Sequence, residues 1–158
     1  AYGLLTLNQV YLLGATDANR STVEFGAGAY VWEYNKANYA NIFPAFLKGR
    51  TAIVNNDKAE YETQALFIRT QIEKAIAAAA VGYLEKWKNG ATDAARAHAI
   101  GEGIGFIYSL RFATIHQADA QFSDEILNSV IGSEFGFWDI EAAKVNSAVT
   151  TIKTKFNL

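Results

Sequence analysis

One histidine and one glutamate stand four residues apart in a segment that is rich in glycine. They are His98 and Glu102, within the stretch AHAIGEGIGF at residues 97–106. In an α-helix this spacing places both side chains on one face. Imidazole nitrogen and carboxylate oxygen are both ligands of transition metals. The pair therefore predicts either two ligands of one metal ion, or a hydrogen bond through which Glu102 orients His98.

Three glycines lie in the same stretch, at Gly101, Gly103 and Gly105. Each glycine inside a helix costs about 1 kcal/mol relative to alanine. Three of them in five positions indicate a structural requirement for small residues. The pattern predicts that another helix backbone approaches this segment closely, or that a buried polar group or ion lies against it.

No other segment carries recognisable catalytic chemistry. The second histidine, His116, is expected in a loop at the surface. The chain has no cysteine, which excludes thiol nucleophiles and thiolate metal sites. It also lacks the H-E-x-x-H zinc signature, a phosphate-binding glycine loop and a G-x-S-x-G nucleophile motif. A metallopeptidase built on His98 and Glu102 would need a third ligand and a general base.

The elements that would position this pair are helices. Alanine is abundant, Pro44 is the one proline, and no stretch shows sustained strand alternation. The sequence predicts an all-α fold, an antiparallel bundle of about six or seven helices joined by short loops. The expected helices cover about 1–13, 22–37, 41–54, 57–88, 92–112, 123–131 and 140–156.

Local signals set the expected helix ends. Pro44 is placed in a first helical turn, where its missing N–H is tolerated. Gly90 is expected to end the longest helix with a positive φ. Ser123 and Asp139 are expected as N-caps of the last two helices. The first helix has no N-cap residue before it, which indicates a helix that begins upstream of residue 1.

Length and composition indicate one domain over residues 1–158 with a single core. Hydrophobic residues make up 51% and charged residues 19%, so part of the apolar surface is expected to be covered by another protein segment. The net charge of -2 argues against nucleic acid as a partner. The longest strongly apolar run, residues 75–84, is too short to span a bilayer. The absence of both cysteine and methionine favours an exported protein.

Aromatic residues gather in the first third of the chain. The cluster predicts core packing, with a ligand pocket or a partner surface as the alternative. Its members are Phe25, Tyr30, Trp32, Tyr34, Tyr39, Phe43 and Phe46.

Three ordered motifs resemble domain-of-unknown-function family 4856, an imelysin-like family of exported Gram-negative bacterial proteins. They are FLKGRTAIV at 46–54, HAIGEGIGFIYSLRF at 98–112 and GFWD at 136–139. The resemblance implies an all-helical protein of two related halves, with this chain similar to the C-terminal half. The N-terminal half is then the expected partner, and each half is expected to carry an H-x-x-x-E segment.

The resemblance also implies a location and a cofactor, a divalent metal or iron. Imelysins carry G-x-H-x-x-E, are linked to iron uptake and have been labelled peptidases. Here three residues, rather than two, separate His98 from Glu102, so the pattern differs. The implied location is the outer membrane surface, for instance as a lipoprotein, the periplasm or the outside of the cell.

Three functions are compatible with these observations. The first is an envelope or secreted binding protein in iron or metal acquisition, with His98 and Glu102 as metal ligands. The second is a structural helical module that packs on its own N-terminal half or on another envelope protein. The third is a metallopeptidase, although no catalytic residue can be assigned, and the enzyme hypothesis is the weakest of the three.

Overall fold

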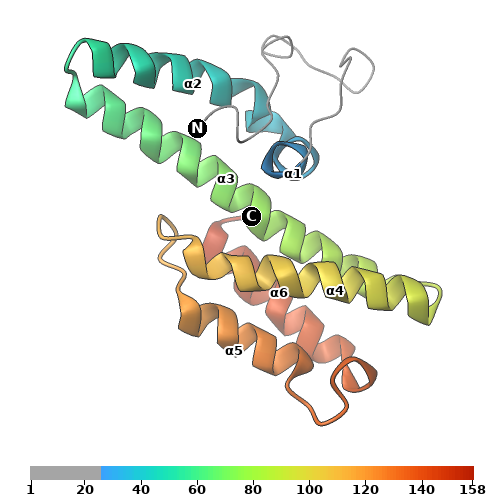
Figure 1. The fold of residues 1–158 in the computed structure, drawn as a ribbon. Coiled ribbons are helices and arrows are strands. Elements are labelled where there is room, and N and C mark those ends of the chain that lie inside the picture. The colour runs from blue at the N-terminus through green and yellow to red at the C-terminus, as the bar shows by residue number, and fades with distance from the viewer. Residues whose placement is uncertain (1–25) are drawn as a thin grey trace. The chain divides into compact units, whose positions relative to one another are not determined.

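The structure is a computed structural model that describes residues 26–158, and these residues form six α-helices and no strand. Figure 1 shows the helices in chain order. The predicted all-α class is therefore confirmed. The predicted helix 1–13 and the start of the predicted helix 22–37 lie outside the described residues. The helices are α1 Ala27–Tyr34, α2 Lys36–Val54, α3 Lys58–Lys88, α4 Asp93–Ser109, α5 Ala120–Ile131 and α6 Ala142–Phe156, with 3-10 turns η3 Leu110–Phe112 and η4 Gly136–Asp139.

The chain divides into two compact units, residues 1–75 and 76–158. The described part of the first unit holds a hydrophobic cluster formed by α1, α2 and the first half of α3. Its fully buried members include Val31, Ile42 and Ala75. The second unit has its own cluster, so the buried residues form two clusters where the composition predicts one core. The single-domain organisation over residues 1–158 stays a prediction.

The second unit packs the end of α3 with α4, α5 and α6. Its cluster contains residues with almost no exposed surface on each helix, among them Leu84, Ile107, Val130 and Phe156. The predicted stripe of α6 is confirmed, because Val145, Val149, Ile152 and Phe156 are all buried. This stripe steps by three and four residues, which places it on one helix face.

Local signals at the α2–α3 and α3–α4 turns act as predicted. Asn56 ends α2 with a φ of 56°, in the left-handed region that asparagine tolerates. Asp57 Oδ1 accepts a hydrogen bond from the Glu60 amide at 3.0 Å, which caps α3. Thr92 Oγ1 accepts one from the Ala95 amide at 3.1 Å and caps α4.

Predicted details at the start of α2 and at the end of α3 are wrong. Helix α2 begins at Lys36, so Pro44 lies inside the helix and not in its first turn. The break lies at Asn35, whose side-chain amide donates to the Gln71 carbonyl oxygen of α3 at 3.0 Å. Helix α3 ends at Lys88, directly before Asn89 and Gly90, as predicted, but Gly90 has no positive φ. A Cβ there would lie 2.7 Å from Arg96 Cγ, so glycine is needed for this close approach.

Two predicted N-caps are also wrong. Helix α5 begins three residues before Ser123, because the Asp119 carboxylate accepts a hydrogen bond from the Phe122 amide at 2.9 Å. Ser123 is instead fully buried inside the helix. Helix α6 begins after Glu141, and Asp139 lies in the preceding turn η4.

None of the helices in residues 26–158 is long and apolar enough to cross a membrane.

Candidate functional site

Helix α4 presents one face to the core of the second unit and another to solvent. Its buried residues are Ala99, Ile100, Gly103 and Ile107, which recur at helical spacing. On this side Phe106 stacks on Tyr83 of α3, with the ring centroids 5.5 Å apart. The packing fixes the rotation of α4 and therefore decides which residues face outward.

The three glycines of α4 have different surroundings. A Cβ on Gly103 would lie 3.6 Å from Tyr83 Cβ and 3.9 Å from Leu84 Cδ2, so Gly103 allows α3 and α4 to approach. A Cβ on Gly101 or on Gly105 would meet no atom within 4 Å. The predicted close approach of another helix is thus confirmed at Gly103. Contacts in the described fold do not explain the other two glycines.

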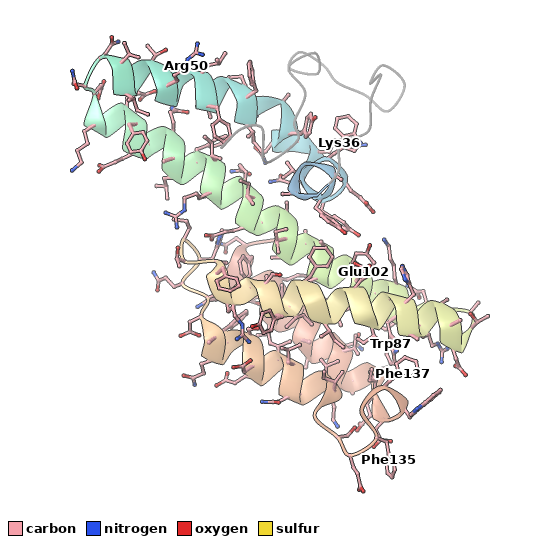
Figure 2. The ribbon with its side chains drawn as sticks, viewed as in Figure 1. Lys36, Arg50, Trp87, Glu102, Phe135 and Phe137 are labelled. Carbon is pink, nitrogen blue, oxygen red and sulfur yellow. The ribbon has the colours of Figure 1, made fainter. Side chains whose placement is uncertain are left out.

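His98 and Glu102 lie on the outer side of α4, near these two glycines. His98 is exposed and Glu102 is half-buried, and Figure 2 shows Glu102 on the surface of α4. The described structure contains no hydrogen bond between the two side chains, so the simple orienting bond is not formed. No group of three or more His, Cys, Asp or Glu residues that could hold a metal occurs within residues 26–158. The described chain therefore brings two potential ligands together and supplies no third.

A shallow pocket of about 250 Å³ lies beside Glu102. Gly101, Gly105, Phe106 and Ser109 complete its lining. The Ser109 hydroxyl donates to the Gly105 carbonyl oxygen at 2.8 Å, so this hydroxyl is satisfied within the helix. The missing side chains at Gly101 and Gly105 leave the helix backbone accessible from outside.

Two aromatic side chains continue this outer face toward the end of the helix. Tyr108 is 50% exposed, and Phe112 in turn η3 is 71% exposed. Within α4, Tyr108 follows Gly105 by three residues and Gly101 by seven, which places it on the same side of the helix. Phe112 follows in the 3-10 turn at the end of α4. We call the stripe of His98, Gly101, Glu102, Gly105, Tyr108 and Phe112 the α4 outer face. The spacing alone could have predicted its aromatic end.

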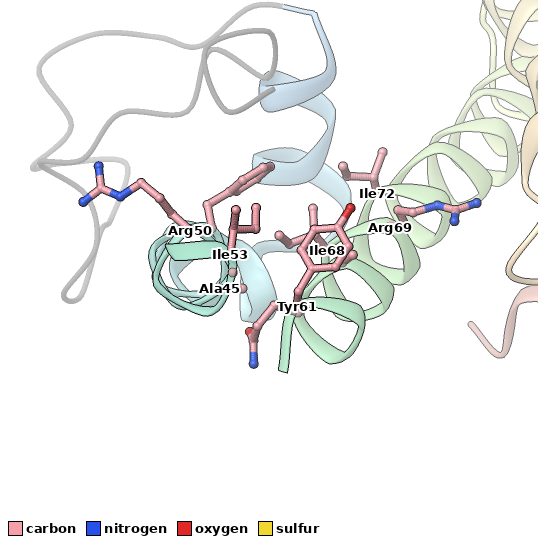
Figure 3. Close-up of a pocket in the computed structure, with 11 residues that line it drawn as sticks. Ala45, Arg50, Ile53, Tyr61, Ile68, Arg69 and Ile72 are labelled. Carbon is pink, nitrogen blue, oxygen red and sulfur yellow. The ribbon is translucent and has the colours of Figure 1, made fainter. Parts of the chain in front are cut away.

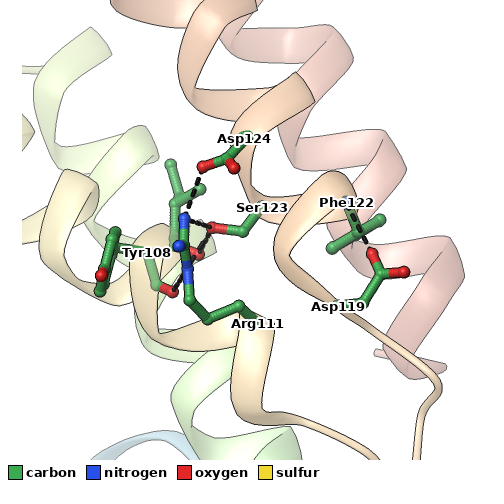
Figure 4. A network of polar contacts seen from close by, with 7 residues as sticks. Tyr108, Arg111, Asp119, Phe122, Ser123 and Asp124 are labelled. Atoms are coloured by element: carbon green, nitrogen blue, oxygen red, sulfur yellow. Dashed lines mark hydrogen bonds and ion pairs between the residues drawn. The ribbon is translucent and has the colours of Figure 1, made fainter.

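Arg111 holds the aromatic end of the α4 outer face in place. Its guanidinium carbon lies 3.8 Å from the centre of the Tyr108 ring, and its Nε donates to the Tyr108 carbonyl oxygen at 3.1 Å. The same guanidinium group forms an ion pair with Asp124 of α5. Figure 4 shows these contacts together with Ser123, whose hydroxyl donates to the Ile107 carbonyl oxygen at 2.9 Å. The network ties the end of α4 to the start of α5.

Arg111→Ala is expected to lower the free energy of unfolding by about 1–2 kcal/mol, because a charge-assisted bond to Asp124 and the packing on Tyr108 are lost together. The change should also increase the mobility of the Tyr108 ring. Urea denaturation measures the first effect, and aromatic side-chain NMR relaxation measures the second. Lys144→Ala, which removes an exposed ion pair with Glu141, is the control and should change stability by less than about 0.5 kcal/mol. Equal losses for both variants would contradict the structural role of Arg111.

His116 and part of the aromatic cluster pack against other side chains. His116 lies in a turn between η3 and α5, but its ring packs 4.8 Å from the Phe156 ring and is half-buried, so the predicted surface position is wrong. Of the aromatic cluster, Trp32, Tyr39 and Phe43 are buried, which confirms core packing for them. Phe25 lies outside the described residues.

Most of the chain matches one protein family. The family model described as "Domain of unknown function (DUF4856)" matches residues 10–158. The chain belongs to the DUF4856 family. The resemblance carried by the three motifs is thereby confirmed at the level of this family, and the imelysin-like relationship stays a prediction. No curated protein and no solved structure matches this DUF4856 chain. The α4 outer face is therefore interpreted from its own residues.

Proposed function

We propose that this chain is a helical interaction module of the cell envelope and that the α4 outer face binds another α-helix. The observation that carries the proposal is the pair of exposed glycines, Gly101 and Gly105, at which a Cβ would meet nothing within 4 Å. Two such glycines together destabilise α4 by about 1–2 kcal/mol relative to alanine. A close helix–helix contact uses small residues at this spacing, because they let two backbones approach.

The aromatic end of the α4 outer face supports the same function. Tyr108 and Phe112 offer large apolar surfaces next to the glycine notch, and aromatic residues contribute strongly to binding energy at interfaces. The Arg111 guanidinium group packs on the Tyr108 ring. This contact is expected to restrict the ring and so to lower the loss of side-chain entropy when a partner binds. The first partner to test is the N-terminal half that the family resemblance implies, and another envelope protein is the second.

Site-specific photo-crosslinking in cells tests this function. A photoreactive amino acid at Tyr108 should crosslink to a helical segment, which mass spectrometry of the product identifies. The same amino acid at Thr150, an exposed residue of α6, is the control and should give no such product. Gly105→Leu should suppress the crosslink from position 108 by at least about tenfold, because a bulky side chain in the notch prevents close approach. Equal crosslinking at positions 108 and 150 would overturn the proposal.

A second candidate function is metal binding in iron or metal acquisition, and it rests on the His98 and Glu102 pair. Both side chains lie on the α4 outer face, are free of hydrogen bonds in the described structure, and carry donor atoms suited to transition metals. The described chain supplies two ligands, whereas a metal site needs about four. In this proposal a helix bound at the notch supplies the remaining ligands, so metal binding depends on the partner. A metallopeptidase would need a general base in addition, and within residues 26–158 no further His, Asp or Glu forms a metal-binding group with His98 and Glu102.

Metal binding is tested by elemental analysis. The protein is purified without chelators and in complex with its bound partner. A stoichiometric metal in the wild type that is lost in His98→Ala/Glu102→Ala would support the second function. Glu85→Ala, which removes a half-exposed carboxylate paired with Lys88, is the control and should leave the metal content unchanged. The same metal content in all three proteins would exclude His98 and Glu102 as ligands.

A further inference from the structure

The α2–α3 hairpin of the first unit contains a second open site, a groove of about 550 Å³. We call it the hairpin groove. Figure 3 shows it in close-up, with Ile53 of α2 and Tyr61, Ile68 and Ile72 of α3 between the two helices. Its lining is mostly apolar and contains no Asp or Glu.

Small residues line part of the hairpin groove. They are Ala45 and Gly49 of α2 and Ala65 of α3. Gly49 is buried, and a Cβ there would lie 3.6 Å from Gln64 Cβ, so the two helices are close at this point. The lining on α3 runs from Tyr61 to Ile72. These positions span roughly 16 Å, or about three helical turns. The groove is therefore about as long as three turns of an α-helix.

The hairpin groove exposes large apolar side chains. Ile53 is 61% exposed and Tyr61 is 44% exposed, and both line the groove. Contiguous exposed apolar surface next to a cavity marks a site at which a partner binds. Isoleucine and tyrosine at such a position can each bury substantial area in a complex.

Positive charge flanks the hairpin groove on both sides. Arg50 belongs to α2 and Arg69 to α3, and both contribute to the lining. In Figure 3 their guanidinium groups point outward on opposite sides of the groove. Arg50 makes no hydrogen bond or ion pair with any residue that the structure describes. Arg69 already interacts with another residue of the chain. The lining therefore places one arginine beside each long edge of the groove, and the one at Arg50 is unpaired within the described structure.

We propose that the hairpin groove binds an amphipathic α-helix of a partner protein whose apolar stripe carries carboxylate side chains along both edges. The apolar stripe packs between α2 and α3 against Ile53, Tyr61 and Ile68. The carboxylates on its two edges pair with Arg50 and Arg69, as charged residues that flank the seam of a coiled coil do. In helix-in-groove binding of this kind, the groove contacts apolar side chains at positions i, i+3 or i+4, and i+7 of the bound helix. The inference concerns the first unit and does not depend on the α4 outer face.

A designed peptide tests this proposal on the 158-residue chain. The probe is an 18-residue fluorescein-labelled amphipathic helix with a leucine stripe and glutamate at both edges. A matched peptide carries lysine in place of each glutamate. We expect the glutamate peptide to bind at least about tenfold more tightly by fluorescence anisotropy, with an affinity that falls as salt rises. Arg50→Glu/Arg69→Glu should reverse the preference between the two peptides.

Two neighbouring substitutions separate the hairpin groove from the rest of α2. Ile53 and Val54 are both exposed, at 61% and 75%, but only Ile53 lines the groove. Ile53→Asp should weaken binding of the glutamate peptide by at least about tenfold, and Val54→Asp by less than about twofold. Circular dichroism should show that both variants keep the helical content of the wild type.

Three results would overturn the proposal. The first is equal affinity for the glutamate and lysine peptides. The second is binding that Ile53→Asp leaves unchanged. The third is a dimer of the chain in sedimentation velocity that Ile53→Asp converts to monomer, because the occupant of the hairpin groove would then be a second copy of this chain.

Discussion

Phe156→Ala is expected to lower the free energy of unfolding of the second unit by about 3–5 kcal/mol. Phe156 has no exposed surface, and it is the last residue of α6. Its ring packs 4.8 Å from the His116 ring and 6.3 Å from the Phe122 ring. The alanine variant would leave a cavity where the end of α6, the turn before α5 and α5 itself meet. Urea denaturation followed by circular dichroism measures the loss.

Phe112→Ala is the matched control for this prediction. It removes the same side chain from a residue that is 71% exposed, so stability should change by about 0.5 kcal/mol or less. Phe156→Leu should fall between the two, because it conserves most of the buried volume. Similar losses for Phe156→Ala and Phe112→Ala would show that Phe156 is not the anchor of α6 that its burial indicates.

Local signals in the sequence were sufficient to predict the bounds of the longest helix. Helix α3 was predicted from about 57 to 88 and is observed from Lys58 to Lys88. Its first turn is stabilised by a hydrogen bond between Asp57 and Glu60, three residues apart. Its apolar residues repeat at helical spacing over many turns. Both signals act within a few residues, so the sequence shows them directly.

Contacts between distant residues decided the helix ends that were predicted wrongly. Ser123 was expected as an N-cap, but its hydroxyl bonds to the Ile107 carbonyl oxygen, 16 residues earlier. Asn35 separates α1 from α2 through a bond to Gln71, 36 residues later. Serine and asparagine are frequent at caps and also satisfy buried carbonyl groups. The residue type therefore cannot decide between these roles before the packing is known.

The α4 outer face was predictable only in part. The spacing of His98 and Glu102 and the need for small residues near them were visible in the sequence. The sequence could not show which glycine faces the core, because Gly101 and Gly105 lie on one side of the helix and Gly103 lies on another. The stacking of Phe106 on Tyr83 fixes that rotation. It leaves Gly101 and Gly105 on the outside of the helix, where the backbone of a partner helix could approach them.

Gly103→Leu is expected to lower the free energy of unfolding by about 1–3 kcal/mol through overpacking. A Cβ at Gly103 would already lie 3.6 Å from Tyr83 Cβ, at ordinary contact distance. Alanine therefore fits at this position, but the further carbons of leucine have no space between α3 and α4. The variant would push the two helices apart at Leu84, which has no exposed surface. Urea denaturation of the isolated chain measures the effect.

Gly105→Leu is the matched control, and the opposite sign is expected for it. A Cβ at Gly105 meets nothing within 4 Å, and leucine favours the helix over glycine by about 0.5–1 kcal/mol. The variant should therefore be as stable as the wild type or more stable, while it loses the helix partner of the α4 outer face. Unchanged stability with loss of the partner is the result expected for a glycine that serves binding. A loss of stability is the result expected for a glycine that serves folding. If Gly105→Leu instead destabilised the isolated chain as much as Gly103→Leu, both glycines would serve the internal packing of α4, and the argument for an external helix would fail.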